Sequence, residues 1–178
     1  TGKPKGVMIS HKNLIANNLI HIDGGISAFK GIHSVQGILV GNTVWLGSGQ
    51  DVYGLYIYEG NWVINNILLG GEDAEEATGI WINQGNQTKL LNNDIYGAAL
   101  AALLYNPPDY YYTIEEVNAC GWTGCDEASG NISADPLLQA DGLHLTAGSP
   151  CRDVGADPTG YTADACVLID FDGDTRPA

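Results

Sequence analysis

The apolar residues in the first half of the chain recur in units of 23 to 25 residues. Each unit opens with a glycine and an apolar residue, after which polar or aromatic positions alternate with apolar ones. Such alternation predicts a β-strand with one buried face. The opening pairs are Gly6-Val7, Gly31-Ile32, Gly54-Leu55 and Gly79-Ile80.

Two further apolar stretches follow in each unit, and Gly or Asn separates them. Three short strands in about 24 residues predict one coil of a parallel β-solenoid, whose coils stack about 4.8 Å apart. The alternative is an antiparallel sandwich with coincidental spacing, but tight hairpin signals are scarce and the four units share one register. The second stretches are Leu14-Ile15, Leu39-Val40 and Trp62-Val63-Ile64, and the third are Leu19-Ile20, Val44-Trp45, Ile67-Leu68 and Ile95.

An asparagine recurs at one place in each unit, eleven positions after the first three glycines. Because stacked coils bring equivalent residues together, we expect these side chains to form one vertical column and a ladder of amide hydrogen bonds. The column is predicted to contain Asn17, Asn42 and Asn65, with Asn92 in the fourth unit after a two-residue insertion. Residues 97–104 fit either a short helix or a fifth coil.

Charge divides the chain of 178 residues, whose formal net charge is −14, into two parts. Residues 109–178 hold 13 acidic and two basic side chains. Such an acidic body is not expected to bind nucleic acid through bulk electrostatics, and no run of 18 apolar residues predicts a membrane span. We expect four to five coils in residues 1–105, followed by an acidic segment, 106–178, that packs on the coils or caps them.

The cysteines all lie in this C-terminal segment, at Cys120, Cys125, Cys151 and Cys166. An even number in a loop-rich region predicts two disulfides and an oxidising compartment, with four free thiols as the alternative. Pairing of neighbours, Cys120 with Cys125 and Cys151 with Cys166, is one of three connectivities and the one we adopt.

Three ordered motifs occur in the C-terminal segment: G-N-I-S-A-D-P-L at 130–137, L-H-L-T-A-G-S-P-C-R-D-V-G at 143–155, and D-F-D-G-D-T-R-P at 170–177. Together with the coils, they resemble secreted bacterial proteins of the pectate-lyase-like superfamily of right-handed parallel β-helices. The resemblance implies a right-handed helix and a secreted or cell-surface location. It implies no single activity, because this fold carries lyases, hydrolases, epimerases, adhesins and pure scaffolds.

The opening residues Thr1–Leu14 read T-G-K-P-K-G-V-M-I-S-H-K-N-L. They resemble the phosphate-loop segment of AMP-forming acyl-CoA synthetases, in which a Gly-rich loop and a lysine bind ATP phosphates. The match covers 14 residues, and from Gly6 onward the same residues fit the coil register place for place. We therefore interpret this likeness as coincidental.

Aromatic residues recur on the outward side of the first strand of the second, third and fourth coils, where Met8 stands in the first. His33, Tyr56 and Trp81 occupy equivalent places, and Tyr58 lies beside them. Rings at one-coil spacing can stack on the apolar faces of sugars, or they can simply stabilise the sheet. Both interpretations stay open, and these four residues are the candidate ligand-binding set.

Catalytic residues are harder to assign. Glu59 projects from the same face and is a weak candidate, because glycoside hydrolysis needs a second carboxylate at about 5–10 Å and none is evident. A lyase acting on uronic acids needs a base and a cation, yet between Lys30 and Arg152 the chain has Lys89 alone as a basic residue.

A metal site is suggested by Asp170, Asp172 and Asp174, which alternate around Gly173. Alternating carboxylates are typical of calcium loops, although the glutamate that completes an EF-hand is missing. A solvated acidic turn held by Arg176 explains the pattern equally well. Calcium is the cofactor that the sequence suggests.

The function that we expect is that of a non-catalytic extracellular module with a structural, adhesive or filament-forming role. A glycan is its candidate ligand. End-to-end self-association, or further coils before Thr1, would cover the open end of the solenoid. The alternative is a carbohydrate-active enzyme, a polysaccharide lyase or glycoside hydrolase, acting along an exposed sheet face.

Overall fold

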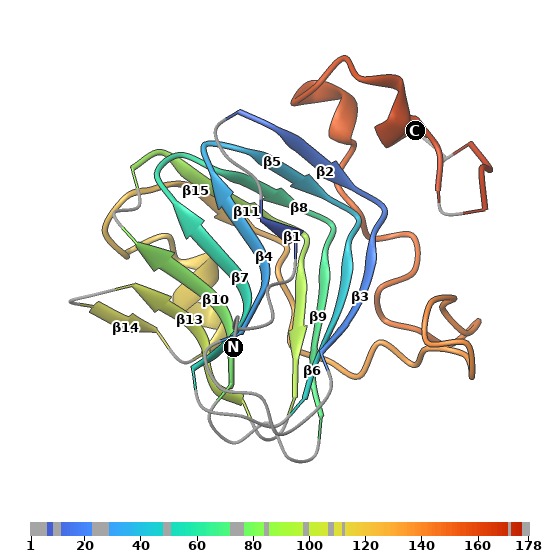
Figure 1. Ribbon diagram of the computed structural model, residues 1–178, viewed down its shortest axis with the longest axis horizontal. Coiled ribbons are helices and arrows are strands. Elements are labelled where there is room, and N and C mark those ends of the chain that lie inside the picture. Colours follow the sequence, from blue (N-terminus) through green and yellow to red (C-terminus); the bar gives the residue numbers. More distant parts are fainter. Residues whose placement is uncertain are drawn as a thin grey trace, which may run out of the picture.

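The computed structural model describes residues 7–8, 12–22, 29–47, 51–71, 77–83, 86–97, 100–106, 109–111, 113–170 and 172–175. These residues form an all-β fold of three sheets, with one short α-helix among them, α1 (Ile114–Asn118) (Figure 1). Most of Thr1–Leu14, and Arg176, lie outside the described residues. No helix in the described part is long and apolar enough to cross a membrane.

The three sheets are built almost entirely from parallel strand pairs, and the antiparallel pair among the described strands is β13–β14. Sheet A contains β1 (Val7–Met8), β4 (Lys30–Val35), β7 (Val52–Tyr58), β10 (Ala77–Asn83), β13 (Leu100–Asn106) and β14 (Asp109–Tyr111). Sheet B contains β2 (Leu14–Ala16), β5 (Ile38–Val40), β8 (Trp62–Ile64), β11 (Thr88–Leu91) and β15 (Cys125–Ser129). Sheet C contains β3 (Leu19–Ile22), β6 (Thr43–Leu46), β9 (Ile67–Gly70) and β12 (Asp94–Tyr96).

The chain enters sheets A, B and C in turn and then repeats the cycle, so that each circuit lies beside the previous one. This order is compatible with a parallel β-helix. The predicted register of the first strands is confirmed, since Val7, Ile32, Leu55 and Ile80 pair in sequence along sheet A. Residues 97–104, which the sequence left undecided, contain most of strand β13, and β15 adds a further strand to sheet B.

The apolar core lies between the three sheets and is filled by the inward side chains of their strands. Each sheet contributes a column of residues whose side chains have no exposure, and burying such a side chain is worth about 1.5–3 kcal/mol. These columns contain Ile32, Leu55 and Ile80 from sheet A, Leu39, Val63 and Leu90 from sheet B, and Val44, Leu68 and Ile95 from sheet C.

A ladder of asparagine side chains runs along the corner between sheets B and C. In every member after the first, the Oδ1 accepts two hydrogen bonds, of 2.8–3.1 Å, from the backbone N–H and the Nδ2 of the asparagine one circuit earlier. Four of the five members are at most 3 % exposed, so these hydrogen bonds satisfy amides that water cannot reach. The ladder contains Asn18, Asn42, Asn66, Asn93 and Asn131.

The predicted asparagine column of Asn17, Asn42, Asn65 and Asn92 is therefore wrong by one residue, except at Asn42. The glycine-to-glycine spacing alternates between 25 and 23 residues in sheet A, whereas the first three strands of sheet B, β2, β5 and β8, repeat every 24 residues. A count that starts at the glycines of sheet A therefore misplaces the corner asparagine by one residue wherever the two spacings differ. The residues that precede the ladder members form a separate outer column of Asn17, Gly41, Asn65, Asn92 and Gly130, all at φ between 51° and 65°.

This outer column turns the chain sharply from sheet B to sheet C. A positive φ is the left-handed conformation, which Gly adopts freely and Asn tolerates better than most residues. The Asn or Gly at this place and the Asn after it therefore have different tasks, the first forming the turn and the second satisfying the buried backbone.

Residues 113–124 close one end of the core. The helix α1 begins with a capping box between Thr113 and Glu116, and its Val117 is fully buried in the core together with Trp122. Asn118 ends the ladder, since its Oδ1 accepts two hydrogen bonds from Asn131 and its Nδ2 donates to the Asn131 carbonyl. The predicted disulfide Cys120–Cys125 is present and fixes this segment to β15.

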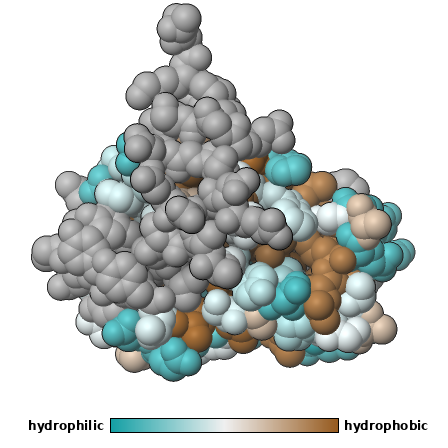
Figure 2. All heavy atoms as spheres, turned by 90° about the horizontal axis from the view of Figure 1, so that it is seen from below, coloured by the Kyte–Doolittle hydropathy of each residue, from teal (hydrophilic) through white to brown (hydrophobic). Residues whose placement is uncertain are grey.

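Residues 154–169, which we call the strap, run along the outside of sheet B beside the outer column (Figure 1). Val167 of the strap is fully buried against Val40, Ile64 and Leu91. The outward face of sheet B is thus apolar because the strap covers it. On the face seen in Figure 2, the apolar residues that are not grey lie in patches among polar ones.

We predict that Asn66→Ala lowers the free energy of unfolding by about 2–4 kcal/mol, because it leaves buried donors and acceptors of two neighbouring circuits unsatisfied. Denaturant unfolding measures the change. The control is Asn86→Ala, at an exposed position, which should stay within about 0.5 kcal/mol of the unchanged protein. Equal effects of the two substitutions would contradict a ladder that supports the fold.

Candidate functional site

The outward face of sheet A carries a cluster of aromatic side chains, which we call the aromatic surface. It contains the four residues predicted from the sequence, His33, Tyr56, Tyr58 and Trp81, and one that the prediction missed, Tyr53. All five are half-buried. Pairing across the strands places His33, Tyr56 and Trp81 in register on β4, β7 and β10.

The rings of the aromatic surface contact one another in stacked, edge-to-face and tilted geometries, and the two contacts of Tyr58 are tilted. Tyr56 and Trp81 stack with an interplanar angle of 12° and centroids 5.8 Å apart. Tyr53 meets Trp81 edge-to-face at 4.9 Å, and His33 meets Tyr56 edge-to-face at 5.3 Å. Offset stacking and edge-to-face contact are the favoured arrangements of aromatic pairs, so the rings hold each other in fixed positions.

Polar groups border these rings. The Tyr56 and Tyr58 hydroxyls are 3.3 Å apart, and Asn83 Nδ2 donates to the Tyr56 hydroxyl at 3.5 Å. The Lys30 ammonium lies 3.3 Å from the centroid of the Tyr56 ring, a cation–π contact. Burial, followed by the hydrogen bond to Tyr58, raises the pKa of Tyr56, so this hydroxyl stays protonated and can donate at neutral pH.

Glu59, the weak catalytic candidate, lies in a turn at the end of β7 with φ of 50°. Its carboxylate accepts a hydrogen bond of 2.6 Å from Gln36 Nε2, and its backbone carbonyl accepts one from Asn61 Nδ2. The carboxylate is thus bound by an amide of the neighbouring circuit. This arrangement gives Glu59 a role in linking two turns and does not support a paired-acid site.

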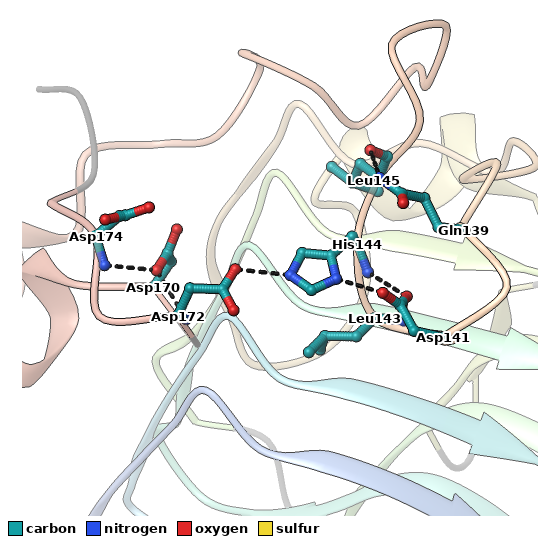
Figure 3. Close-up of polar contacts among 8 residues, drawn as sticks. All are labelled: Gln139, Asp141, Leu143, His144, Leu145, Asp170, Asp172 and Asp174. Carbon is teal, nitrogen blue, oxygen red and sulfur yellow. Dashed lines mark hydrogen bonds and ion pairs between the residues drawn. The ribbon is translucent and has the colours of Figure 1, made fainter.

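The three carboxylates proposed for calcium do not converge on a common point. Asp170 Oδ1 accepts hydrogen bonds of 2.9 Å from the backbone N–H groups of Asp172 and Asp174 (Figure 3). The Asp170 carboxylate thus stabilises the turn that it begins. Asp172 points instead toward His144 (Figure 3). Among the described residues, no group of three or more His, Cys, Asp or Glu side chains is arranged to hold a metal ion. Calcium binding stays a prediction that this geometry does not support.

His144 lies between two carboxylates and joins two loops of the C-terminal segment. Its Nδ1 is 2.5 Å from Asp141 Oδ2, and its Nε2 is 2.6 Å from Asp172 Oδ2 (Figure 3). A ring that donates to carboxylates on both sides carries a proton on each nitrogen and is an imidazolium. The hydrogen bond to Asp141, then that to Asp172, raises the pKa of His144 to about 9. The hydrogen bond to His144 in turn lowers the pKa of Asp141 to about 2.

Cys151 and Cys166 are not joined, in contrast to the predicted pairing, and both are free thiols. The reason is that Cys151 points inward, where its Sγ donates to Asp94 Oδ2 at 3.0 Å, while Cys166 lies exposed in the strap. Burial and the neighbouring Asp94 carboxylate raise the pKa of Cys151 to about 12. A thiol with such a pKa is a poor nucleophile at neutral pH.

A cleft of about 910 Å³ separates the C-terminal segment from the corner between sheets B and C. Asn66, Ile67 and Asp94 belong to its lining on the sheet side, and His144, Arg152 and Asp172 to its lining on the other. Two of these acids are already engaged, Asp94 with Cys151 and the Ala134 N–H, and Asp172 with His144. The carboxylates of Asp94 and Asp172 are therefore less available to a ligand in this cleft than the list of lining residues suggests.

Comparison with known proteins found no match, whether with protein-family models, curated proteins or solved structures. The assignment of function therefore depends on the sequence and the structure of this chain.

Sequence reasoning missed Tyr53 in the aromatic surface and Lys30 and Asn83 at its border. It also missed the contact of His144 with two carboxylates. Asn83 is two residues after Trp81 on β10, so the strand alternation is a signal that could have included it. Tyr53 is three residues before Tyr56 on β7, and strict alternation would have placed it on the opposite face. Asp172 is 28 residues from His144, and no local pattern links the two.

We predict that His144 titrates near pH 9 and that its imidazolium is present at pH 7. Because the pKa in the folded protein lies above the ordinary value of about 6.5, the stabilisation is complete below about pH 6.5 and is lost as the pH rises through about 9. NMR titration of the imidazole nitrogens measures this directly, and His144→Gln identifies the signal. A midpoint near pH 6.5 would contradict the contact with two carboxylates.

Proposed function

We propose that this chain is a non-catalytic extracellular parallel β-helix module that binds a glycan at the aromatic surface. The observation that carries the proposal is the register of His33, Tyr56 and Trp81 on three adjacent strands. It sets half-buried rings in a row at the strand spacing of about 4.8 Å. A row of rings with fixed spacing suits an extended chain of sugar units.

The chemistry of this surface fits a polyhydroxylated ligand. The C–H faces of a sugar ring are apolar and pack on aromatic rings, while its hydroxyls need hydrogen-bond partners at the rim. The Tyr56 and Tyr58 hydroxyls and the Asn83 amide lie beside the rings and can supply such partners. The Lys30 ammonium over Tyr56 is already held by a cation–π contact, so a ligand that stacks on this face of Tyr56 must displace it.

The β-helix interpretation is supported by the repeated order of the three sheets and by the parallel pairing of consecutive circuits. Crossovers between parallel strands are right-handed in almost all proteins, which favours the right-handed form that the sequence motifs suggest. The Cys120–Cys125 disulfide supports an oxidising compartment and hence a secreted or cell-surface location.

The non-catalytic interpretation is supported by the state of the reactive side chains that the structure describes. Glu59 accepts a hydrogen bond from an amide, His144 is a doubly protonated ring between carboxylates, and the Cys151 thiol is buried with a raised pKa. A general base must be able to accept a proton, and a nucleophile must be readily deprotonated. The His144 imidazolium and the Cys151 thiol do not meet those conditions at neutral pH. The carboxylate of Glu59 contacts an amide, and no second acid is among its described hydrogen-bond partners.

We predict that Tyr56→Ala weakens glycan binding by at least about tenfold, because it removes the ring that touches every other member of the aromatic surface. The assay is a screen of soluble polysaccharides by affinity electrophoresis, followed by calorimetry on each polysaccharide that binds. The matched control is Tyr96→Ala, a half-buried tyrosine on sheet C, which should bind like the unchanged protein.

The proposal would be contradicted by a result of either of two kinds, in the binding assay or in a product assay. One is an equal loss of binding in both variants, or no binding of any glycan by the unchanged protein. The other is release of reducing or unsaturated sugars from a bound polysaccharide, which would favour a glycoside hydrolase or a lyase instead.

A further inference from the structure

The strap is held to the sheets mainly through its own main chain. Asn92 Nδ2 donates to the Val154 carbonyl at 2.7 Å, and Asn17 Nδ2 donates to the Ile169 carbonyl at 2.9 Å. Asn65 makes a two-way contact with Ala156, donating to its carbonyl at 2.7 Å and accepting from its N–H at 2.8 Å. The outer column therefore recognises an extended peptide backbone.

The path of the strap follows the asparagines of this column. At the level of Gly41, which has no side chain, the strap leaves the column and crosses sheet B through two short 3₁₀ helices, Pro158–Gly160 and Ala165–Leu168. Where the strap crosses sheet B, Tyr161 meets Trp62 edge-to-face at 5.5 Å, and Val167 packs on Val40, Ile64 and Leu91. The strap returns to the column at Asn17. Both the polar and the apolar contacts thus form one continuous site for a single segment.

The residue just before the strap is in an unfavourable conformation. Asp153 has φ of 58°, in the left-handed region, and its side chain is 79 % exposed. Its one described ionic contact, with the adjacent Arg152, is 3.6 Å long. Two positions earlier, Cys151 is fixed to the buried Asp94. Along the chain, the fixed Cys151 is therefore followed by the exposed Asp153 in its left-handed conformation, and then by the strap, which binds through its backbone.

We propose that the strap is exchanged between two copies of this chain, each strap lying on the sheet B face of the other copy, with the chain opening at Asp153. The exchange reproduces every contact of the strap, because the segment and its site are identical in both copies. It also allows Asp153 to leave the left-handed region, and strain in a hinge favours this kind of swapping.

A second copy is the occupant that the structure favours over an unrelated peptide. Removal of the strap without replacement would expose the row of Val40, Ile64 and Leu91, which is at most 2 % exposed beneath it. Refilling the site takes an apolar residue at the Val167 position and favours a glycine at position 155, where a Cβ would come within 3.2 Å of the Asn65 side chain. The strap of another copy has both.

The hinge is tested with two substitutions at one position, measured by size-exclusion chromatography with light scattering over a range of protein concentrations. Asp153→Gly tolerates a positive φ and should raise the dissociation constant of the dimer by about fivefold or more. Asp153→Pro cannot adopt a positive φ and should shift the equilibrium toward dimer. The unchanged protein should show a dimer that increases with concentration.

Cross-linking identifies which copy holds the strap. In Asn17→Cys the new thiol lies beside Cys166, whose carbonyl Asn17 contacts at 3.2 Å. Oxidation should give a covalent dimer if straps are exchanged and an intramolecular disulfide if they are not. The double variant Asn17→Cys with Cys166→Ser is the control and should give neither product.

The proposal is overturned if the unchanged protein is monomeric at every concentration and the cross-link is intramolecular. A dimer that responds to neither Asp153 substitution, with an intramolecular cross-link, also overturns it, because another surface then forms the dimer. If circular dichroism shows that Asp153→Pro does not fold, the concentration series of the unchanged protein and the cross-link decide the question.

Discussion

The hydrogen bonds between stacked asparagine amides are the constraint on which the rest of this structure depends. In the buried part of the ladder, an amide that lost its neighbour would leave donors and acceptors unsatisfied at a cost of about 1–3 kcal/mol each. A shift of one residue would also move every apolar side chain of a strand to the wrong face. The ladder and the apolar columns therefore select the same register, and each circuit fixes the position of the next.

The residue before each ladder member gives this corner its second property. It forms the turn in the left-handed conformation, and its side chain lies outside, away from the buried amides. Where it is Asn, at positions 17, 65 and 92, the side chain binds the backbone of the strap. Gly41 has no side chain that could bind the strap, and at this level the strap leaves the column and crosses sheet B. Of each pair of adjacent residues at this corner, the second thus stabilises the stacked circuits, and the first, where it is Asn, holds the strap.

The sequence predicted the all-β class, the parallel register of sheet A and the gathering of His33, Tyr56 and Trp81, because strand alternation and glycine spacing are local signals. It misplaced the ladder by one residue, because the lengths of the turns differ between sheets. It found the Cys120–Cys125 disulfide but not the free state of Cys151, whose partner Asp94 is 57 residues away. Contacts at such separation depend on how the C-terminal segment packs, which no local pattern encodes.

Hydrogen exchange of side-chain amides is the measurement that tests the central claim most directly. NMR can follow the exchange of the Nδ2 protons of Asn42, Asn66 and Asn93 one by one in deuterated solvent. The stacked ladder predicts that they are protected to a degree that approaches global unfolding, while those of exposed Asn86 exchange at once. Equally fast exchange at Asn66 and Asn86 would contradict the ladder and, with it, the register of the sheets.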